Sequence, residues 1–206
     1  YIATYDIGTT AVKGVLMSSD GKSAMEKSVT LETLFRGDYK EQRPLDWYSA
    51  FCEISNYFFE KGLQPGEVSG IAMSGQMQDL IPVAGDLSPI GNAILYSDGR
   101  AEAQAREIAG RIGMEEIAAS TGNHFDGSMP FPKLLWMKEE EPALYHAAEK
   151  VLISSKDYVN ARLTGQFTTD VTSASTAGLM DIHKKCWNLD WMERIGLDGE
   201  KLPEIR

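Results

Sequence analysis

Asp6-Ile7-Gly8-Thr9-Thr10, followed closely by Lys13, decides the fold at the start of this 206-residue chain. The stretch separates two apolar runs, residues 1–5 and 12–17, so it predicts a strand, a tight turn and a second strand. Gly8 lets the backbone turn where a side chain would clash. Such a hairpin can place a carboxylate, hydroxyls, backbone N–H groups and an ammonium around a phosphate tail and its magnesium. An ordinary hairpin with threonines in its turn explains the same five residues equally well.

The composition is that of an ordinary folded protein, with 43% hydrophobic and 24% charged residues. The net charge of −10 and the lack of a basic run point away from nucleic acids and anionic membranes. Cys52 and Cys186 are far apart and show neither a disulfide framework nor metal-ligand spacing, as expected in a reducing cytoplasm. No apolar run reaches membrane-spanning length, and we expect no secretory leader. We therefore expect a cytoplasmic protein that binds neither nucleic acid nor membrane.

Periodicity predicts an α/β order of elements. Strands at residues 1–7, 11–17 and 22–32 form a three-strand antiparallel meander, whose second turn contains Asp20-Gly21. A helix after Pro44 then ends at Gly62. The remaining predicted elements are strands at 68–73, 80–83, 93–96 and 151–154, and helices at 98–112, 114–121, 132–140, 142–148, 156–163 and 187–195.

A series of short motifs resembles the FGGY carbohydrate kinases. It starts with residues 6–10 and continues in the family's order. The further segments are residues 74–77 (Ser-Gly-Gln-Met), 96–100 (Tyr-Ser-Asp-Gly-Arg), 121–123 (Thr-Gly-Asn), 130–136, 156–158, 163–165, 169–170 and 174–175. Each piece alone is a weak signal, whereas the ordered set, which extends to Pro203, is specific. The chain looks most similar to the xylulokinase branch.

The resemblance implies the fold of actin, hexokinase and Hsp70, in which two ribonuclease-H-like domains enclose a cleft. The predicted meander, helix and strand fit the first of these domains independently of the family name. Residues 1–206 would then be the N-terminal, sugar-binding domain, and the C-terminal nucleotide-binding domain would be absent from this chain. The family's catalytic aspartate, in a Gly-Gly-Gly-Asp-like motif, has no counterpart here. We therefore expect that residues 1–206 are part of a longer protein, cut near a domain boundary, and that they do not turn over ATP on their own.

The resemblance assigns the first hairpin to ATP and Mg²⁺. Asp6 would orient Mg²⁺ through a water molecule near the transferring phosphate. Gly8, Thr9 and Thr10 would bind phosphate oxygens through backbone N–H groups and hydroxyls. Lys13 would add a positive charge, although a solvated lysine on a strand explains this residue as well.

The resemblance also places a sugar against loops in the second half of the domain. Met77 and Gln78 match the family's substrate-contacting pair, but the xylulokinase pattern has His at the second position, so we expect Gln78 to alter the sugar preference. Asp79 adds a carboxylate where the family often has Gly. Asp98 and Arg100 would bind sugar hydroxyls or hold their loop, and a structural salt bridge explains them equally well.

The remaining motif residues receive weaker assignments. Ser128 and Met129 stand where the family usually has an aromatic residue or a Gly-Phe pair, and Ser128 would line the far wall of the sugar pocket. Lys133 and Trp136 are expected to be structural, with Trp136 in the core and Lys133 bound to a carbonyl or carboxylate. We expect helix-cap or turn roles for Asp157, Asp170 and Asp181, no metal ligand among His124, His146 and His183, and a solvated helix end at residues 139–141.

Three functions remain open on the sequence alone. The first is an ATP-dependent kinase that phosphorylates a hydroxyl of a ketose or polyol, xylulose-like. The second is a catalytically inactive sugar-binding regulatory protein of the same fold. Gln78 and Asp79 are compatible with this interpretation, whereas the intact turn at residues 6–10 argues against it. The third is an actin-like filament or chaperone ATPase, against which the Gly-Gln-Met and Thr-Gly-Asn segments count. The expected partners are a small sugar or polyol and the protein's own C-terminal domain, and a homodimer is left open.

Overall fold

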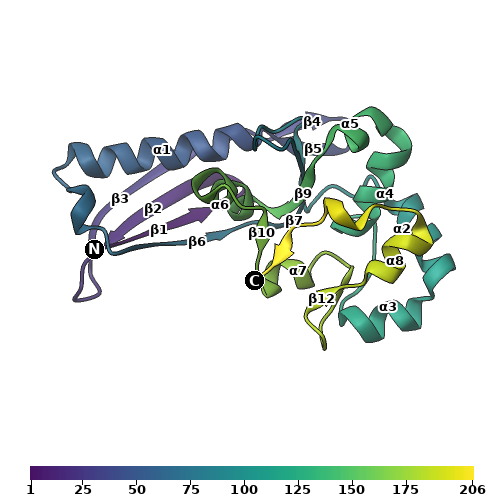
Figure 1. Cartoon of the computed structure of the whole chain (residues 1–206). Coiled ribbons are helices and arrows are strands. Elements are labelled where there is room, and N and C mark those ends of the chain that lie inside the picture. The colour runs from purple at the N-terminus through teal and green to yellow at the C-terminus, as the bar shows by residue number, and fades with distance from the viewer.

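Four strands near the N-terminus form the first sheet of the computed structural model, which describes residues 1–206 (Figure 1). Strands β1 (Ile2–Ile7), β2 (Ala11–Met17) and β3 (Ser23–Thr30) form an antiparallel meander, and β6 (Gly70–Gly75) pairs with β1 in parallel. The order across the sheet is β3-β2-β1-β6. The predicted meander is confirmed, with a third strand that ends two residues earlier than expected.

Helix α1 (Pro44–Glu60) runs along one face of this sheet, as Figure 1 shows. Its apolar residues recur at steps of four, three and four, so they share one side of the helix and are buried: Trp47, Phe51, Ile54 and Phe58. Phe51 packs against Tyr5 of β1, with ring centroids 4.4 Å apart. Gly14 on β2 is required by this close packing, because a Cβ there would lie 2.3 Å from Ile54 Cγ2.

A second sheet has the strand order β4-β5-β8-β7-β9. Its strands are β4 (Leu34–Arg36), β5 (Tyr39–Gln42), β8 (Ala93–Ile94), β7 (Met77–Val83) and β9 (Lys150–Ser154). Periodicity did not predict the β4–β5 hairpin, because β4 has only three residues and its central Phe35 is 70% exposed. The hairpin turns at Gly37, whose φ of +62° favours glycine.

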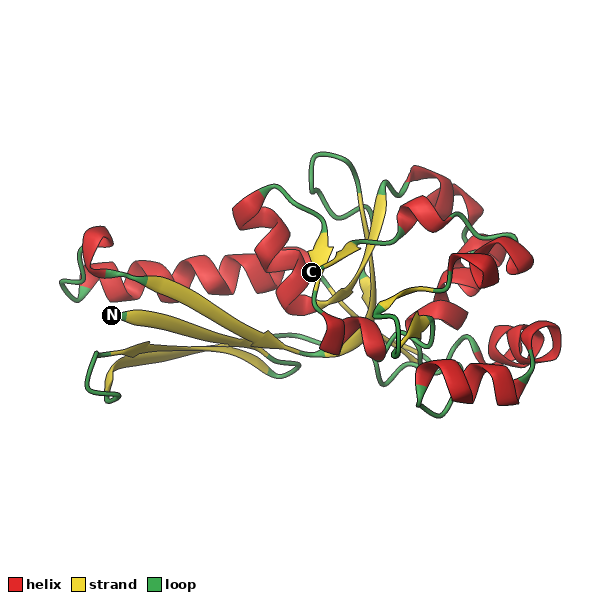
Figure 2. Cartoon of the chain, turned by 60° about the horizontal axis from the view of Figure 1, so that its bottom comes forward, coloured by secondary structure: helices red, strands yellow, loops and turns green.

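The remaining helices gather mostly at the end of the molecule away from the first sheet (Figure 2). They are α2 (Glu102–Ile112), α3 (Met114–Thr121), α4 (Pro130–Glu140), α5 (Pro142–Ala147), α6 (Ser155–Thr164), α7 (Val171–Ser175) and α8 (Leu189–Ile195), with 3-10 turns at Pro65–Glu67 and Gly199–Lys201. Of these, α6 packs instead beside α1. None of the helices has the length and apolar character needed to cross a membrane.

Two short strand pairs follow α6, and two of the predicted helices begin later than expected. Strands β11 (Met180–Asp181) and β12 (Cys186–Trp187) pair with each other, so the last helix starts at Leu189 instead of residue 187. Strand β10 (Thr168–Thr169) pairs in parallel with β13 (Glu204–Ile205) close to the C-terminus. The helix expected from residue 98 begins at Glu102, because Asp98 is bound in the preceding loop.

Strand β7 separates two hydrophobic cores. Leu80 belongs to the core formed with α2 and α4, whereas Ile81 and Val83 belong to the core under α1 and the first sheet. The chain passes from β6 into β7 through Gln76 alone. Because β1 and β6 are parallel, their carboxyl ends meet at the same edge of the first sheet, directly beside the start of β7. Polar residues that follow these two strands are therefore brought together.

Candidate functional site

A hollow of about 460 Å³, here called the turn pocket, opens where β1 and β6 end. It is lined by the end of β1 and the turn after it, by the segment from β6 into β7, and by two residues from elsewhere. The lining residues are Asp6, Gly8, Thr9, Gly75, Gln76, Met77, Gln78, Tyr96 and Thr176. Polar side chains and glycines dominate this list, so the pocket offers several hydrogen-bonding groups to a small polar molecule.

Five of the residues singled out from the sequence lie together in the turn pocket: Asp6, Gly8, Thr9, Met77 and Gln78. Five others do not line it: Thr10, Lys13, Asp98, Arg100 and Ser128. Sequence reasoning missed Tyr96 and Gln76 as lining residues, although both belong to motifs that it recognised. No sequence pattern identified Thr176, which comes to the pocket from the end of α7.

A second hollow of about 460 Å³, here called the strand-face pocket, lies on the open face of the first sheet. Asp6 is paired with Lys13 on β2 and with Ser74 on β6, so the three side chains point to the same face. Ser74 Oγ donates a hydrogen bond of 2.9 Å to Asp6 Oδ1. Asp6 lines both the turn pocket and the strand-face pocket, so its carboxylate stands at the boundary between them.

The turn after β1 offers free backbone donors. The N–H groups of Gly8, Thr9 and Thr10 make no hydrogen bond within the chain. The hydroxyl of Thr9, which we expected to face a phosphate, donates instead to Gln76 Oε1 at 2.7 Å. Three successive free N–H groups in a turn are a known way to bind an anion, and the Thr9 hydroxyl contributes only its lone pairs in this conformation.

Two serines at the start of α6 hold the pocket floor. Ser155 Oγ donates to the carbonyl of Ile7 at 2.7 Å, and Ser154 Oγ donates to the carbonyl of Gln76 at 2.7 Å. This approach requires a glycine at position 75, since a Cβ there would lie 2.5 Å from Ser155 Oγ. The ends of β1 and β6 are thereby fixed relative to each other.

Gln78 has a φ of +65°, a left-handed conformation that costs energy for a residue with a Cβ. The buried ammonium of Lys133 on α4 offsets that cost by donating to the carbonyls of Gln78 at 3.0 Å and Leu95 at 2.7 Å. The prediction that Lys133 binds a carbonyl is confirmed, and Trp136 is buried in the core as expected. Lys133 therefore fixes the direction in which the Gln78 side chain leaves the backbone.

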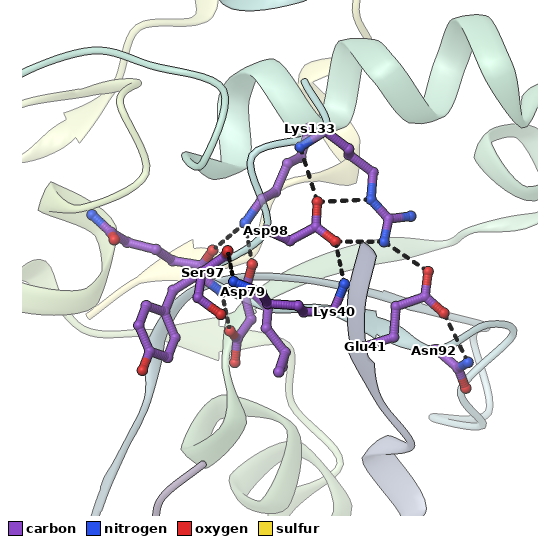
Figure 3. A network of polar contacts seen from close by, with 11 residues as sticks. Lys40, Glu41, Asp79, Asn92, Ser97, Asp98 and Lys133 are labelled. Carbon is purple, nitrogen blue, oxygen red and sulfur yellow. Dashed lines mark hydrogen bonds and ion pairs between the residues drawn. The ribbon is translucent and has the colours of Figure 1, made fainter. Parts of the chain in front are cut away.

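Asp79, which belongs to the polar network of Figure 3, adds to this support. Its Oδ1 accepts a hydrogen bond of 3.0 Å from the N–H of Tyr96, while its buried Oδ2 has no partner. Burial raises the pKa of Asp79 to about 8, against the opposing charge of Lys133. Burial likewise lowers the pKa of Lys133 to about 8, against the attraction of Asp79 and Asp98. The carboxyl of Asp79 thus favours its neutral form, and it anchors the backbone of Tyr96 at the pocket wall.

A larger hollow of about 580 Å³ lies along the free edge of β6 beside α6. Its charged residues are already paired, since Lys156 Nζ binds Asp157 at 2.7 Å and also binds Asp170. It contains none of the residues from the turn after β1. The turn pocket, with its free donors and unpaired groups, is therefore the stronger candidate for a site.

Comparison with known proteins agrees with this geometry. Residues 1–206 match the family model described as the FGGY family of carbohydrate kinases, N-terminal domain. The chain belongs to the FGGY family. A xylulose kinase of Lactococcus lactis subsp. lactis (strain IL1403) is 33% identical over 215 residues, which cover 100% of this chain and 41% of that protein.

Solved structures of two Lactobacillus acidophilus enzymes show the same fold. The gluconate kinase and the ligand-bound xylulose kinase each match with a TM-score of 0.90 and 28% identity. Both matches cover 100% of this chain, but only 41% and 42% of those chains. The FGGY domain described here therefore spans about two fifths of its relatives' length, and both the family and the fold class expected from the motifs are confirmed.

In this FGGY domain, Asp98 and Arg100 form a buried ion pair away from the turn pocket. The Arg100 guanidinium donates to both carboxylate oxygens of Asp98 and to Glu41, at 2.7–3.0 Å. It also lies over the rings of Tyr39 and Trp136, 3.8 and 4.8 Å from their centroids. Burial alone would raise the pKa of Asp98, but the bonds from Arg100 and from the Lys40 N–H lower it. The structural salt bridge that the sequence left open is present.

The other assigned polar residues mostly form local turns. Ser128 donates its N–H to Asp126 Oδ1 at 2.8 Å, just before α4. Asp170 caps α7 by accepting from the Ser173 N–H at 3.0 Å, and Asp181 accepts from two N–H groups in its turn, as predicted. Residues 139–141 are exposed, also as predicted. Asp157 was predicted wrongly, because it is buried and bound to Lys156 and Thr169 instead of capping a helix.

No group of three or more His, Cys, Asp or Glu side chains converges in the chain in a way that could hold a metal ion. A magnesium ion near Asp6 would therefore take most of its oxygen ligands from water and phosphate, which is usual for Mg²⁺ at phosphate-transfer sites. The single exposed carboxylate of Asp6 fits that arrangement.

Proposed function

We propose that this chain is the sugar-binding half of an ATP-dependent kinase that transfers the γ-phosphoryl group to a hydroxyl of a xylulose-like ketose or polyol. The observation that carries the proposal is the position of Asp6. Its carboxylate lies between a pocket lined by neutral polar side chains and a second pocket that contains Lys13 and Ser74. Membership of the FGGY family and the similarity to xylulose kinases support the choice of reaction.

The turn pocket is proposed to bind the sugar. Gln78 offers an amide that can both donate and accept, and Thr176 and Tyr96, which also line the pocket, add hydroxyls. Met77 supplies an apolar surface for the carbon chain. A ligand that carries a hydroxyl on nearly every carbon needs several such groups, and the energy lost when one stays unpaired gives the specificity.

The turn after β1 is proposed to bind the terminal phosphates of ATP. The free N–H groups of Gly8, Thr9 and Thr10 would donate to phosphate oxygens, and Lys13 would add a positive charge from the open sheet face. Asp6 would hold a water molecule of the Mg²⁺ shell. When bound, ATP supplies the phosphoryl group and Mg²⁺ neutralises its charge, so the chain's own task is to orient the two substrates.

Asp98, Arg100 and Ser128 are proposed to act indirectly. The ion pair of Asp98 and Arg100 holds the loop that presents Tyr96, and Ser128 shapes the turn before α4 that carries Lys133. The nucleotide-binding domain and the base that accepts the sugar proton are proposed to lie outside residues 1–206. A cytoplasmic location fits the free thiols of Cys52 and Cys186, and assembly as a homodimer remains part of the proposal.

A release assay for ADP with the full-length protein tests this function. We expect ATP- and Mg²⁺-dependent ADP release with at least one ketose, polyol or sugar acid in a panel that includes xylulose and gluconate. The isolated chain of residues 1–206 is the control and is expected to release no ADP. Sugar binding without turnover in the full-length protein would instead favour an inactive sugar-binding regulatory protein.

A further inference from the structure

Gln42 is a buried amide whose hydrogen-bonding capacity is completely used. It ends β5, two residues before α1 begins at Pro44, and is only 1% exposed. Its Nε2 donates to the carbonyl of Thr9 at 2.7 Å and to Thr33 Oγ1 at 3.2 Å. Its Oε1 accepts from Trp47 Nε1 and from Gln76 Nε2, both at 3.0 Å. An amide has two donors and two acceptor positions, and all four are filled.

Three of these residues form a closed ring, here called the amide ring. Gln42 donates to the Thr9 carbonyl, Thr9 Oγ1 donates to Gln76 Oε1, and Gln76 Nε2 donates back to Gln42 Oε1. Residues 9, 42 and 76 come from three separate segments of the chain. Trp47, at 0% exposure in the α1 core, fixes Gln42 from the other side.

We propose that Gln42 is a positioning residue that locks the phosphate-binding turn against the sugar-binding loop. The inference rests on the proposed function, since it concerns the same pocket. Thr9 belongs to the turn, and Gln76 directly precedes Met77 and Gln78, so the ring joins both substrate sites through one amide. A fully paired buried network is rigid, and loss of one donor leaves a buried partner unpaired.

The ring also decides what Thr9 presents to a ligand. The Thr9 hydroxyl donates its proton to Gln76 Oε1, so only its oxygen lone pairs remain for a ligand. It can accept a hydrogen bond from a sugar hydroxyl or a water molecule. Phosphate oxygens are left to the backbone N–H groups of residues 8–10. Gln42 thereby separates the roles of the Thr9 side chain and backbone.

The substitution Gln42→Glu tests this role in the full-length protein. When the introduced carboxyl is ionised, it can still accept hydrogen bonds from Trp47 and Gln76, but it has no proton to donate to the Thr9 carbonyl. When the carboxyl is neutral, its O–H can donate to that carbonyl again. Burial raises the pKa of such a carboxyl from about 4 to about 7, so the group is neutral at pH 5.5 and mostly ionised at pH 8. We expect a kcat/KM for the sugar about tenfold below wild type at pH 8 and within about threefold of it at pH 5.5.

Two controls separate positioning from stability. Gln64→Glu makes the same change at an exposed site beyond the far end of α1, and its kcat/KM relative to wild type is expected to be constant with pH. Thr33→Val removes the one Gln42 donor bond that lies outside the ring, so both kcat and KM are expected to stay near wild type. Expressing each result relative to wild type at the same pH cancels the influence of the neighbouring charged groups, namely Asp6 in the pocket, Glu41 and Arg43.

A second readout requires no turnover. In ¹⁵N NMR spectra of the Gln42→Glu protein, the N–H signals of residues 8–10 and 76–78 should shift together, with one midpoint, as the introduced carboxyl titrates. If the Gln42→Glu protein does not fold, Gln76→Glu serves as the second variant. It removes a single hydrogen-bond donor from the amide ring, and its kcat/KM should likewise return towards wild type at pH 5.5. A kcat/KM ratio independent of pH, or movement of only one of the two segments, would overturn the proposal, even where the unfolding temperature falls.

Discussion

The turn after β1 and the loop that holds Asp98 both belong to polar motifs of the same family, yet they differ in how their groups are used. In the loop, Asp98 and Arg100 are buried and paired with each other, with Glu41 and with the Lys40 N–H. In the turn, three N–H groups have no partner in the chain, and the Asp6 carboxylate is exposed. A motif therefore contains both residues that hold the backbone and residues left free for a ligand, and only their partners distinguish the two.

The largest expected effect on catalysis is at Asp6, whose carboxylate is exposed in the turn after β1. Asp6→Ala in the full-length protein should lower kcat by about 100-fold or more, because a charge that orients Mg²⁺ near the transferring phosphate is lost. Its unfolding temperature should stay near wild type, since Asp6 is exposed and accepts a side-chain bond only from Ser74. Asp38→Ala, at an exposed aspartate in the β4–β5 turn, is the control and should leave kcat unchanged. A near wild-type rate for Asp6→Ala would remove the turn from the active site.

The largest expected effect on stability, as opposed to catalysis, is at the buried ion pair of Asp98 and Arg100. Arg100→Ala should reduce the free energy of unfolding by about 3–5 kcal/mol, because it leaves Asp98 buried without its counter-charge. Denaturant unfolding of the chain measures this loss. Arg106→Ala, which breaks an exposed pair with Glu102, should cost less than about 1 kcal/mol. Folded Arg100→Ala protein that lost sugar binding while keeping its stability would mean that Arg100 contacts the ligand directly.

An intermediate effect concerns Asp79, which supports the pocket from below. In the folded chain the pKa of Asp79 is about 8, whereas its ordinary value is 3.8. At any pH between these two values, Asp79 is protonated in the folded chain and loses its proton on unfolding. The wild type therefore loses stability as the pH rises from about 4 to 8. Asp79→Asn cannot ionise, so it should match the wild type near pH 4 and exceed its unfolding free energy by at least about 2 kcal/mol at pH 8. An equal pH dependence in both proteins, measured by urea unfolding, would show that Asp79 ionises freely.

The smallest effect is on specificity at the free wall of the turn pocket. Gln78→His should raise the kcat/KM for xylulose relative to other ketoses and polyols by about threefold to tenfold, since one hydrogen-bond partner is exchanged. The left-handed backbone at this position is retained, because Lys133 binds the Gln78 carbonyl and not its side chain. Unchanged relative rates across the sugar panel would exclude Gln78 from the specificity set.

Local patterns predicted the parts of the fold that depend on local sequence. The meander and α1 follow from alternation and from apolar steps of three and four, and both were confirmed. The β4–β5 hairpin lacks such a pattern. The start of α2 depends on Asp98, whose partners include the Lys40 N–H, 58 residues away in sequence.

The same distinction applies to the site. Motifs identified Asp6, Gly8 and Gln78 because these residues stand in recognisable strings. Gln42 lies outside every string used, and its bonds to Thr9 and Gln76 span 33 and 34 residues. The support under Gln78 likewise comes from Lys133, 55 residues away. Long-range partners of this kind become visible only when the chain is folded.

A crystal structure of the full-length protein with xylulose, Mg²⁺ and a non-hydrolysable ATP analogue tests the central claim most directly. We predict the sugar in the turn pocket, with a hydroxyl within hydrogen-bonding distance of the Gln78 amide. The terminal phosphate should lie on the N–H groups of residues 8–10, with a water of the Mg²⁺ shell on Asp6. A phosphate bound elsewhere, with the turn closed to any anion, would contradict the account.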